Sequence, residues 1–315
     1  DTHGYGVKTM RVLFFGTAAF AIPSLERLVA AGHQVVRCVT QPDRPQGRGM
    51  KVLPSPVKEA AGRLGLSVET PERLDAAIEA SRRVEADLGV VISYGRLIPA
   101  TLLRLHRQVM VGVHPSLLPK HRGASPIAWA ILNGEQTTGV TVFRLSERLD
   151  AGEILLQQTV SIEPQETTEH LSQRLALLGA DLLLTTMAQL QEGMSVARPQ
   201  DEQHATFAPK LTKAHGRIDW QASAATIDRL VRAAVPWPGA YTVWRGQSLK
   251  VLATRYDSRN HTRHGRPGEI LSVSGEGVAV ATGEGELVIQ ALQLSGRRRM
   301  TAQEFLAGHR IQVGE

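Results

Sequence analysis

The stretch RVLFFGTAAFAIPSLERLVAAGHQVVRCVT, residues 11–40, sets the pattern that decides the fold of this chain. Its first part, RVLFFG, is a short apolar run that ends in glycine, which is typical of a buried strand. PSLERLVAAG begins with proline, keeps helical spacing of its apolar residues and stops at glycine, as a helix does. QVVRCVT is a second apolar run. The stretch therefore predicts a strand, a helix and a strand in turn.

This alternation of strand-like and helix-like segments continues to about Gly193. LGVVISYG and VMVGVH predict two further strands, and Pro56 to Leu64 predicts one of the helices between strands. A pair of strands joined by SERLDAG and a long amphipathic helix complete the domain. We predict an α/β fold, with a Rossmann-like, mostly parallel sheet and helices on both faces. Ligands of such sheets bind beyond the carboxyl ends of the strands.

The chain changes character after the long helix. Residues 195–208 contain proline and show no periodicity, which predicts a linker. Over residues 209–315, short β-rich runs between glycine turns predict a small antiparallel barrel or sandwich. We take residues 1–9 as an N-terminal extension and expect the first domain to span residues 10–194.

The composition indicates a protein of the cell interior. The 315 residues include no apolar run of the roughly 18 residues needed to cross a bilayer, and no start typical of a secretion signal. The single cysteine, Cys38, cannot form a disulfide within the chain, which agrees with a reducing compartment, and we expect a cytoplasmic location.

The positive charge is concentrated in the C-terminal part. Residues 209–315 hold 15 Lys and Arg against 9 Asp and Glu, whereas residues 1–208 hold 21 of each. The surplus behind the net charge of +6 suggests a polyanionic partner, although ordinary surface charge explains so small a surplus as well.

Two residues are candidates for chemistry. A lone histidine in a strand is more often structural, but His114 stands at the end of the predicted strand VMVGVH, where ligands of such sheets bind, so both interpretations stay open. Asp150, in RLDAGEI, has the ordinary interpretation of a turn aspartate that bonds its own backbone before Gly152. Together they suggest acid–base catalysis, because a carboxylate beside an imidazole favours the charged ring and can select its tautomer.

Several other chemistries are excluded. The chain lacks the dinucleotide and nucleotide-triphosphate glycine motifs, a Cys/His metal spacing and a G-x-S-x-G elbow. The remaining unusual passage, Gln41 to Lys58, is rich in proline and basic residues and predicts an exposed loop. Beside the basic C-terminal part, this loop suggests a nucleic-acid contact.

At this point the chain, from about Met10 to its C-terminal end, resembles the methionyl-tRNA formyltransferases. The specific motifs are RVLFFGTAAFAIPSLERL, TQPDRPQGRGMKVLPSPVK, VISYGRLIP, HPSLLPKHRGASPI, RLDAGEIL, RIDW, PWPGAY and LQLSGRRRMTAQEFLAG. The resemblance implies formyl transfer from 10-formyltetrahydrofolate to the amine of methionyl initiator tRNA. It also implies that the C-terminal part is an OB-like β-barrel, and that no metal is needed. We expect a monomer. The chain has no long heptad pattern, and the partner that the resemblance implies is a large RNA.

The resemblance also assigns roles to single residues. His114 stabilises the oxyanion and moves protons, and Asp150 sustains the charged histidine and helps to deprotonate the amine. The residues that bind the folate are Ser116, Leu117, Leu118, Pro119, Tyr94 and Gly95. Those that contact the tRNA are Arg44, Arg48 and Lys51 in the basic loop, and Lys210 and Lys213 at the entrance of the barrel.

One departure from the family pattern concerns the machinery itself. Gly112 stands where the family has an asparagine that donates to the formyl oxygen. Loss of one such donor typically lowers a rate about 100- to 1000-fold. Ser146, Arg148 and Pro115 also differ from the pattern, and the charge of Arg148 is a candidate for compensation. Two alternatives therefore stay open: a catalytically impaired protein that binds folate and tRNA, and a formyltransferase for an amino sugar.

Overall fold

The computed structural model describes residues 8–46, 51–73, 76, 84–105, 109–257, 259 and 265–315. The chain divides into two compact units. The first comprises Asp1–Pro126, Thr137–Ser161 and Ser172–Ala208, and the second comprises Ile127–Gln136, Ile162–Leu171 and Pro209–Glu315. The domain boundaries drawn from the sequence stay predictions.

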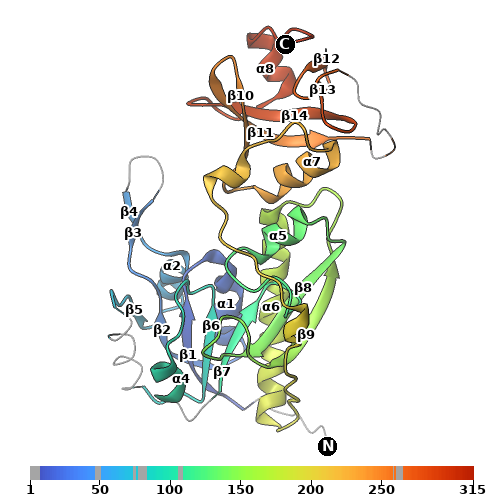
Figure 1. Ribbon diagram of the computed structural model, residues 1–315. Helices are drawn as coiled ribbons and strands as arrows, with labels where there is room; N and C mark the ends of the chain where they lie inside the picture. Colours follow the sequence, from blue (N-terminus) through green and yellow to red (C-terminus); the bar gives the residue numbers. More distant parts are fainter. Residues whose placement is uncertain are drawn as a thin grey trace, which may run out of the picture. The chain divides into compact units, whose positions relative to one another are not determined.

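The first unit is built on a seven-stranded sheet (Figure 1). Its strands are β1 (Arg11–Gly16), β2 (Gln34–Val39), β5 (Val68–Glu69), β6 (Leu88–Ile92), β7 (Met110–His114), β8 (Thr137–Arg144) and β9 (Ile154–Ser161). They lie in the order β5-β2-β1-β6-β7-β8-β9. The pairs from β5 to β7 are parallel, and β7-β8 and β8-β9 are antiparallel. The predicted mostly parallel sheet is confirmed.

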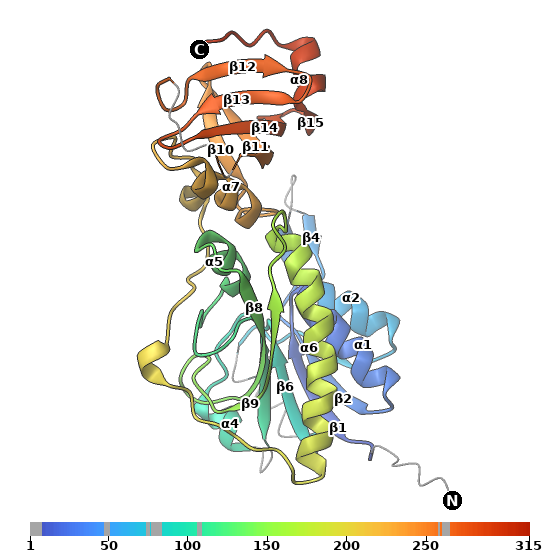
Figure 2. The same ribbon diagram turned by 90° about the vertical axis from the view of Figure 1, so that its right-hand side faces the viewer.

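Helices cover both faces of this sheet (Figure 2). On one face, Arg27 of α1 (Ile22–Ala30) pairs with Asp181 of α6 (Thr168–Gln191) at 3.3 Å. On the other face, Leu102 of α4 (Ala100–Leu105) packs with Leu13 and Phe15 of β1 in one buried cluster. Successive side chains of β1 point to opposite faces, so a continuous apolar strand serves both layers. No helix within the described ranges is long and apolar enough to cross a membrane.

The predicted basic loop carries a short antiparallel hairpin, β3 (Arg44–Gln46) and β4 (Lys51–Leu53). Its base is anchored where Lys58 Nζ donates to Asp43 Oδ2 at 2.7 Å, beside α2 (Pro56–Arg63). The sequence interpretation counted Lys58 as one of the loop's basic charges. In the structure a carboxylate partner neutralises it.

The second unit contains a six-stranded antiparallel sheet. Strands β10 (Ala240–Trp244), β11 (Gln247–Arg255), β14 (Glu286–Leu294), β13 (Gly277–Ala281) and β12 (Ile270–Ser274) are neighbours in that order, and β15 (Met300–Thr301) pairs with β14. Val251, Val280 and Leu292 lie in its core, with Ile227 of α7 (Ala224–Ala233) and Phe305 of α8 (Ala302–Gly308). The predicted smaller, antiparallel C-terminal domain is confirmed. Residues 127–136, which include most of α5 (Pro126–Leu132), also belong to this unit.

The predicted linker includes a segment that is hydrogen-bonded to the first unit. We call residues 198–208 the strap. Arg198 forms an isolated antiparallel bridge with Ile154, and Phe207 a parallel one with Arg122. Between them lies the short 3-10 helix η2 (Glu202–His204). The strap therefore joins the start of β9 to the loop around Arg122, which are far apart in the sequence.

Candidate active site

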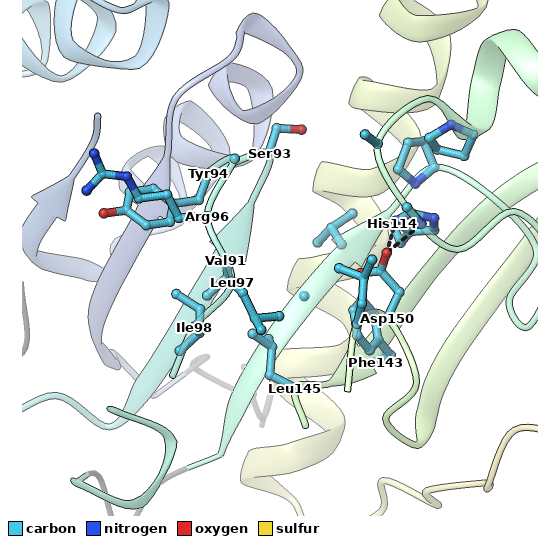
Figure 3. A pocket seen from close by; sticks show the side chains of 18 of the residues that line it. Val91, Ser93, Tyr94, Arg96, Leu97, Ile98, His114, Phe143, Leu145 and Asp150 are labelled. Atoms are coloured by element: carbon cyan, nitrogen blue, oxygen red, sulfur yellow. Dashed lines mark hydrogen bonds and ion pairs between the residues drawn. The ribbon is translucent and has the colours of Figure 1, made fainter. Parts of the chain in front are cut away.

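A pocket of about 520 Å³ lies in the first unit at the carboxyl ends of β6 and β7. Figure 3 shows His114, Asp150 and Phe143 on one side of it, and Tyr94 and Arg96 on the other. The position agrees with the prediction that ligands bind beyond the ends of these strands. The predicted candidates His114 and Asp150 both line this pocket, together with Tyr94 and Gly95.

His114 is the last residue of β7 and is buried. Its Nε2 lies 2.9 Å from the backbone oxygen of His121. Because a carbonyl oxygen can only accept, Nε2 carries a hydrogen and donates it. The other ring nitrogen, Nδ1, faces Asp150 Oδ2 at 3.7 Å, too far for a direct hydrogen bond but close enough for an ion pair with the charged ring. Neutral His114 thus presents a basic Nδ1 on the side of Asp150.

Asp150 is held in an unusual backbone conformation with φ of 49°. Its Oδ2 accepts a hydrogen bond from the backbone N–H of Gly123 at 2.8 Å. A Cβ atom at Gly152 would lie 1.7 Å from the backbone oxygen of Arg144, so only glycine fits two residues after the aspartate. This close approach explains the Asp-x-Gly spacing. A left-handed conformation at a residue other than glycine stores strain that neighbouring contacts must maintain.

The space beside Gly112 is occupied by an aromatic ring. Gly112 and Phe143 are cross-strand partners on β7 and β8. A Cβ atom at residue 112 would lie 2.6 and 2.8 Å from two ring atoms of Phe143. The Phe143 ring also meets His114 edge to face, with 6.5 Å between the ring centroids. An asparagine therefore does not fit at this position unless Phe143 moves.

The four predicted folate residues that follow Pro115 do not line the pocket. Ser116 and Leu118 are buried. Thr141 holds their loop in place, because its Oγ1 donates to Ser116 O at 2.6 Å and accepts from Leu118 N at 3.1 Å. Gln157 Nε2 donates to Leu118 O at 3.0 Å. The loop of Ser116, Leu117, Leu118 and Pro119 is thus a rigid support behind His114, and its contact with folate stays a prediction.

The other predicted folate residues form the opposite wall. Burial raises the pKa of the Tyr94 hydroxyl. The backbone oxygen of Tyr94 accepts hydrogen bonds from Gln41 Nε2 at 2.7 Å and from Thr17 Oγ1 at 2.9 Å. Gly95 follows with φ of 80°. Gln41 stands at the base of the basic hairpin, so this wall of the pocket is bonded to the root of the hairpin.

The predicted tRNA contacts fall into three groups. Arg44 and Lys51 are exposed on the hairpin, on β3 and β4. Arg48 lies outside the described residues. Lys210 and Lys213 are exposed in the second unit, and Lys213 begins the short helix η3 (Lys213–Gly216).

Sequence reasoning missed a charged cluster behind the site. Arg122 is 2% exposed, and its guanidinium donates to Gln200 Oε1 and to both carboxylate oxygens of Glu202. Hydrogen bonds from Arg122, and then from Arg148, lower the pKa of Glu202 to about 2. Arg122 stands in a motif already quoted, but its partners lie in the predicted linker, where no spacing points to them.

Arg148 does not serve as a free positive charge. Its Nη2 donates to Glu202 Oε2 at 2.7 Å, and its side chain is 69% exposed. Glu202 pairs with Arg122 as well, so one carboxylate faces two guanidiniums, and the compensation suggested for the missing asparagine stays a prediction for Arg148. Among the described residues, no three or more His, Cys, Asp and Glu side chains are grouped to hold a metal ion.

Comparisons with known sequences match both parts of the chain. The family model described as Formyl transferase matches residues 10–187, and the one described as Formyl transferase, C-terminal domain, matches residues 210–310. A methionyl-tRNA formyltransferase of Heliobacterium modesticaldum is 44% identical over 314 residues, which cover 97% of this chain and 99% of the relative. That of Geobacter metallireducens is 42% identical over 307 residues, with 97% of each chain covered.

Solved structures share the fold. HypX from Aquifex aeolicus in complex with tetrahydrofolic acid has a TM-score of 0.67 and 21% identity, covering 96% of this chain and 47% of that one. The sugar 3N-formyl transferase WlaRD, in the presence of dTDP and 5-N-formyl-THF, has a TM-score of 0.66 and 15% identity. The match covers 92% of this chain and 100% of that one. At these identities the two structures support the fold alone.

Proposed function

The chain belongs to the formyl transferase family, and we propose that it transfers the formyl group of 10-formyltetrahydrofolate to the amino group of methionyl initiator tRNA. The relatives named for this activity match nearly its full length. The observation that carries the site assignment is the approach of His114 Nδ1 to Asp150 Oδ2, at 3.7 Å on the wall of the pocket.

The reaction requires two proton transfers. The methionyl nitrogen forms a bond to the formyl carbon, and the bond from that carbon to the folate nitrogen breaks. The amine loses a proton and the folate nitrogen gains one. We assign the proton transfers to Nδ1 of His114, since its Nε2 hydrogen is engaged by His121, and Asp150 stabilises the charged ring while it holds the proton.

The pocket suits a flat donor. Ile98, Phe143 and Leu145 supply apolar wall, and His114 and Asp150 supply the polar groups. Its volume of about 520 Å³ lies within the range of small-molecule sites. Rigid walls orient a ring against the reacting groups, which lowers the entropic part of the barrier. Tyr94 and Gly95 are assigned to the pterin side.

The acceptor is a large polyanion, and the chain offers exposed cations for it. Arg44 and Lys51 on the hairpin and Lys210 and Lys213 in the second unit are assigned to the tRNA. Such contacts attract phosphate regardless of base sequence. We assign the protein to the cytoplasm, where charged tRNA is present, and expect it to act as a monomer.

The two alternatives are not favoured. An impaired binding protein was suggested by Gly112, and the Phe143 ring beside it replaces no donor, but the similar full-length relatives carry the name of the formyltransferase. An amino-sugar acceptor does not need the basic hairpin, and the similar full-length relatives carry the tRNA name.

The test is product formation. The purified chain is incubated with 10-formyltetrahydrofolate and methionyl initiator tRNA, or with an amino sugar nucleotide, and N-formylmethionine is measured after release from the tRNA. We expect formylmethionine and no formylated sugar. Absence of formylmethionine at high enzyme concentration would refute the proposed function, and Asp150→Asn provides the control for background transfer.

A further inference from the structure

We propose that Gln200 is a positioning residue for formyl transfer, because its amide holds the backbone of Asp150 so that the carboxylate faces His114. The inference rests on the proposed function. Gln200 belongs to the strap and not to the residues that line the pocket. It acts through Asp150 and does not touch the substrates.

The donor side of the amide binds the aspartate loop. Gln200 Nε2 donates to Asp150 O at 2.8 Å and to Gly152 O at 2.7 Å. An amide nitrogen has two hydrogens, so these two bonds use its full capacity. They fix the Asp150–Ala151 and Gly152–Glu153 peptide planes, the first of them directly after the strained Asp150, whose φ is 49°.

The acceptor side of the amide binds the histidine loop. Gln200 Oε1 accepts from Arg122 Nη2 at 2.7 Å and from Arg122 Nε at 3.1 Å. The Arg122 guanidinium is a donor only. If the Gln200 amide were flipped, its NH₂ group would face these donors and no hydrogen bond could form. Arg122 therefore locks the orientation in which Gln200 donates to the aspartate loop.

Arg122 stands between the two residues that define the catalytic geometry. The residue before it, His121, provides the oxygen that accepts from His114, and the residue after it, Gly123, donates to Asp150 Oδ2. Gln200 thus joins the loop that holds the imidazole to the loop that holds the carboxylate. A displacement of about 1 Å between reacting groups can cost about 100-fold in rate.

The strap has other attachments that survive without this amide. Arg198 pairs with Ile154 through two backbone bonds, of 2.7 and 2.9 Å, and Thr206 Oγ1 accepts from His121 N at 2.9 Å. A change at Gln200 therefore leaves the strap in place and alters chiefly the local support of Asp150. This separation makes the proposal testable.

The decisive variant is Gln200→Glu. It keeps an oxygen acceptor for Arg122 but removes both donors to the aspartate loop. Gln203→Glu is the matched control, because it makes the same change at an exposed position of the strap. For Gln200→Glu we expect kcat to fall about 10- to 100-fold, with KM for both substrates within about twofold of wild type. Gln203→Glu should remain within about twofold in both constants.

A second comparison separates positioning from general loss of structure. In the Asp150→Asn background, Gln200→Glu should lower kcat by less than about threefold, since the group that it positions no longer acts. Equal losses in both backgrounds, or a Gln200→Glu variant with wild-type kcat, would overturn the proposal. If the unaltered chain forms no formylmethionine, the proposed function itself fails. That outcome is seen in the wild-type protein, so it is distinguishable from the two outcomes that overturn the role of Gln200.

Discussion

The two sides of His114 are held in different ways. In the pair of His114 and Asp150, position depends on the hydrogen bond that the His121 oxygen accepts from the imidazole and on those that Gly123 and Gln200 donate to Asp150. Towards Gly112, position depends on the ring of Phe143, which fills the available space without a polar contact to residue 112. One side is a directional network and the other is apolar packing.

The two sides of His114 should therefore differ in the substitutions that they tolerate. A buried hydrogen-bond network loses much when one partner is removed, because the remaining groups are left unsatisfied. Apolar packing tolerates a change of shape when a neighbour can change with it. The polar side should therefore fail through single substitutions, and the apolar side should respond to pairs.

The largest effect is expected at the polar side for His114→Ala. Removal of the group that carries the proton should lower kcat about 1000-fold, within the range of general acid–base catalysis. The measurement is the rate of formylmethionyl-tRNA formation at saturating donor and acceptor. His170→Ala, an exposed histidine of α6, is the control and should leave the rate unchanged. A comparable loss in both variants would break the assignment.

Next in size is Arg122→Met. It removes a buried guanidinium that joins Gln200 to Glu202, and we expect the free energy of unfolding to fall by about 3 kcal/mol, the low end for a broken buried pair, because Glu202 is half-exposed. Chemical denaturation provides the measurement. Arg148→Met is the matched control at the exposed partner of the same carboxylate and should cost at most about 1 kcal/mol. Equal costs would remove the distinction between the buried and exposed arginines.

The apolar side gives the third prediction. Gly112→Asn forces the Phe143 ring to move and should lower the free energy of unfolding by about 1–3 kcal/mol, as overpacking does. Phe143→Leu makes space, so the double variant should be destabilised by less than the sum of the two single variants. Strict additivity, or a stable Gly112→Asn with higher activity, would mean that the ring does not occupy the place inferred for it.

Most of the fold and the two candidate residues of the site could be predicted from the sequence, because the patterns that mark them are local. Strand and helix periodicity is local, so the parallel sheet and the antiparallel C-terminal domain could be identified from it. His114 and Asp150 could be found because each stands at a recognisable strand end or turn. Gln200 could not, since its partners lie in loops far away along the chain. Nor could the filling of the Gly112 space, which depends on strand register with Phe143.

The smallest effect concerns acid stability. The pKa of Glu202 is lowered from 4.5 to about 2 in the folded protein, by Arg122 first and then Arg148. A depressed carboxyl pKa contributes stability above the unfolded value, and that contribution is lost as pH falls from about 4.5 towards 2. Glu202→Gln should therefore flatten the pH dependence of the unfolding midpoint within this window and leave the midpoint's pH dependence above pH 5 unchanged. An unaltered acid slope would contradict the role given to the pair.

The most direct test of the central claim is a double-mutant cycle on the turnover rate with His114→Ala, Asp150→Asn and the two combined. If the imidazole and the carboxylate act as one unit, the double variant should be no slower than His114→Ala by more than about threefold. If the separate losses multiply, the two groups act independently, and the account of a paired catalytic site is contradicted.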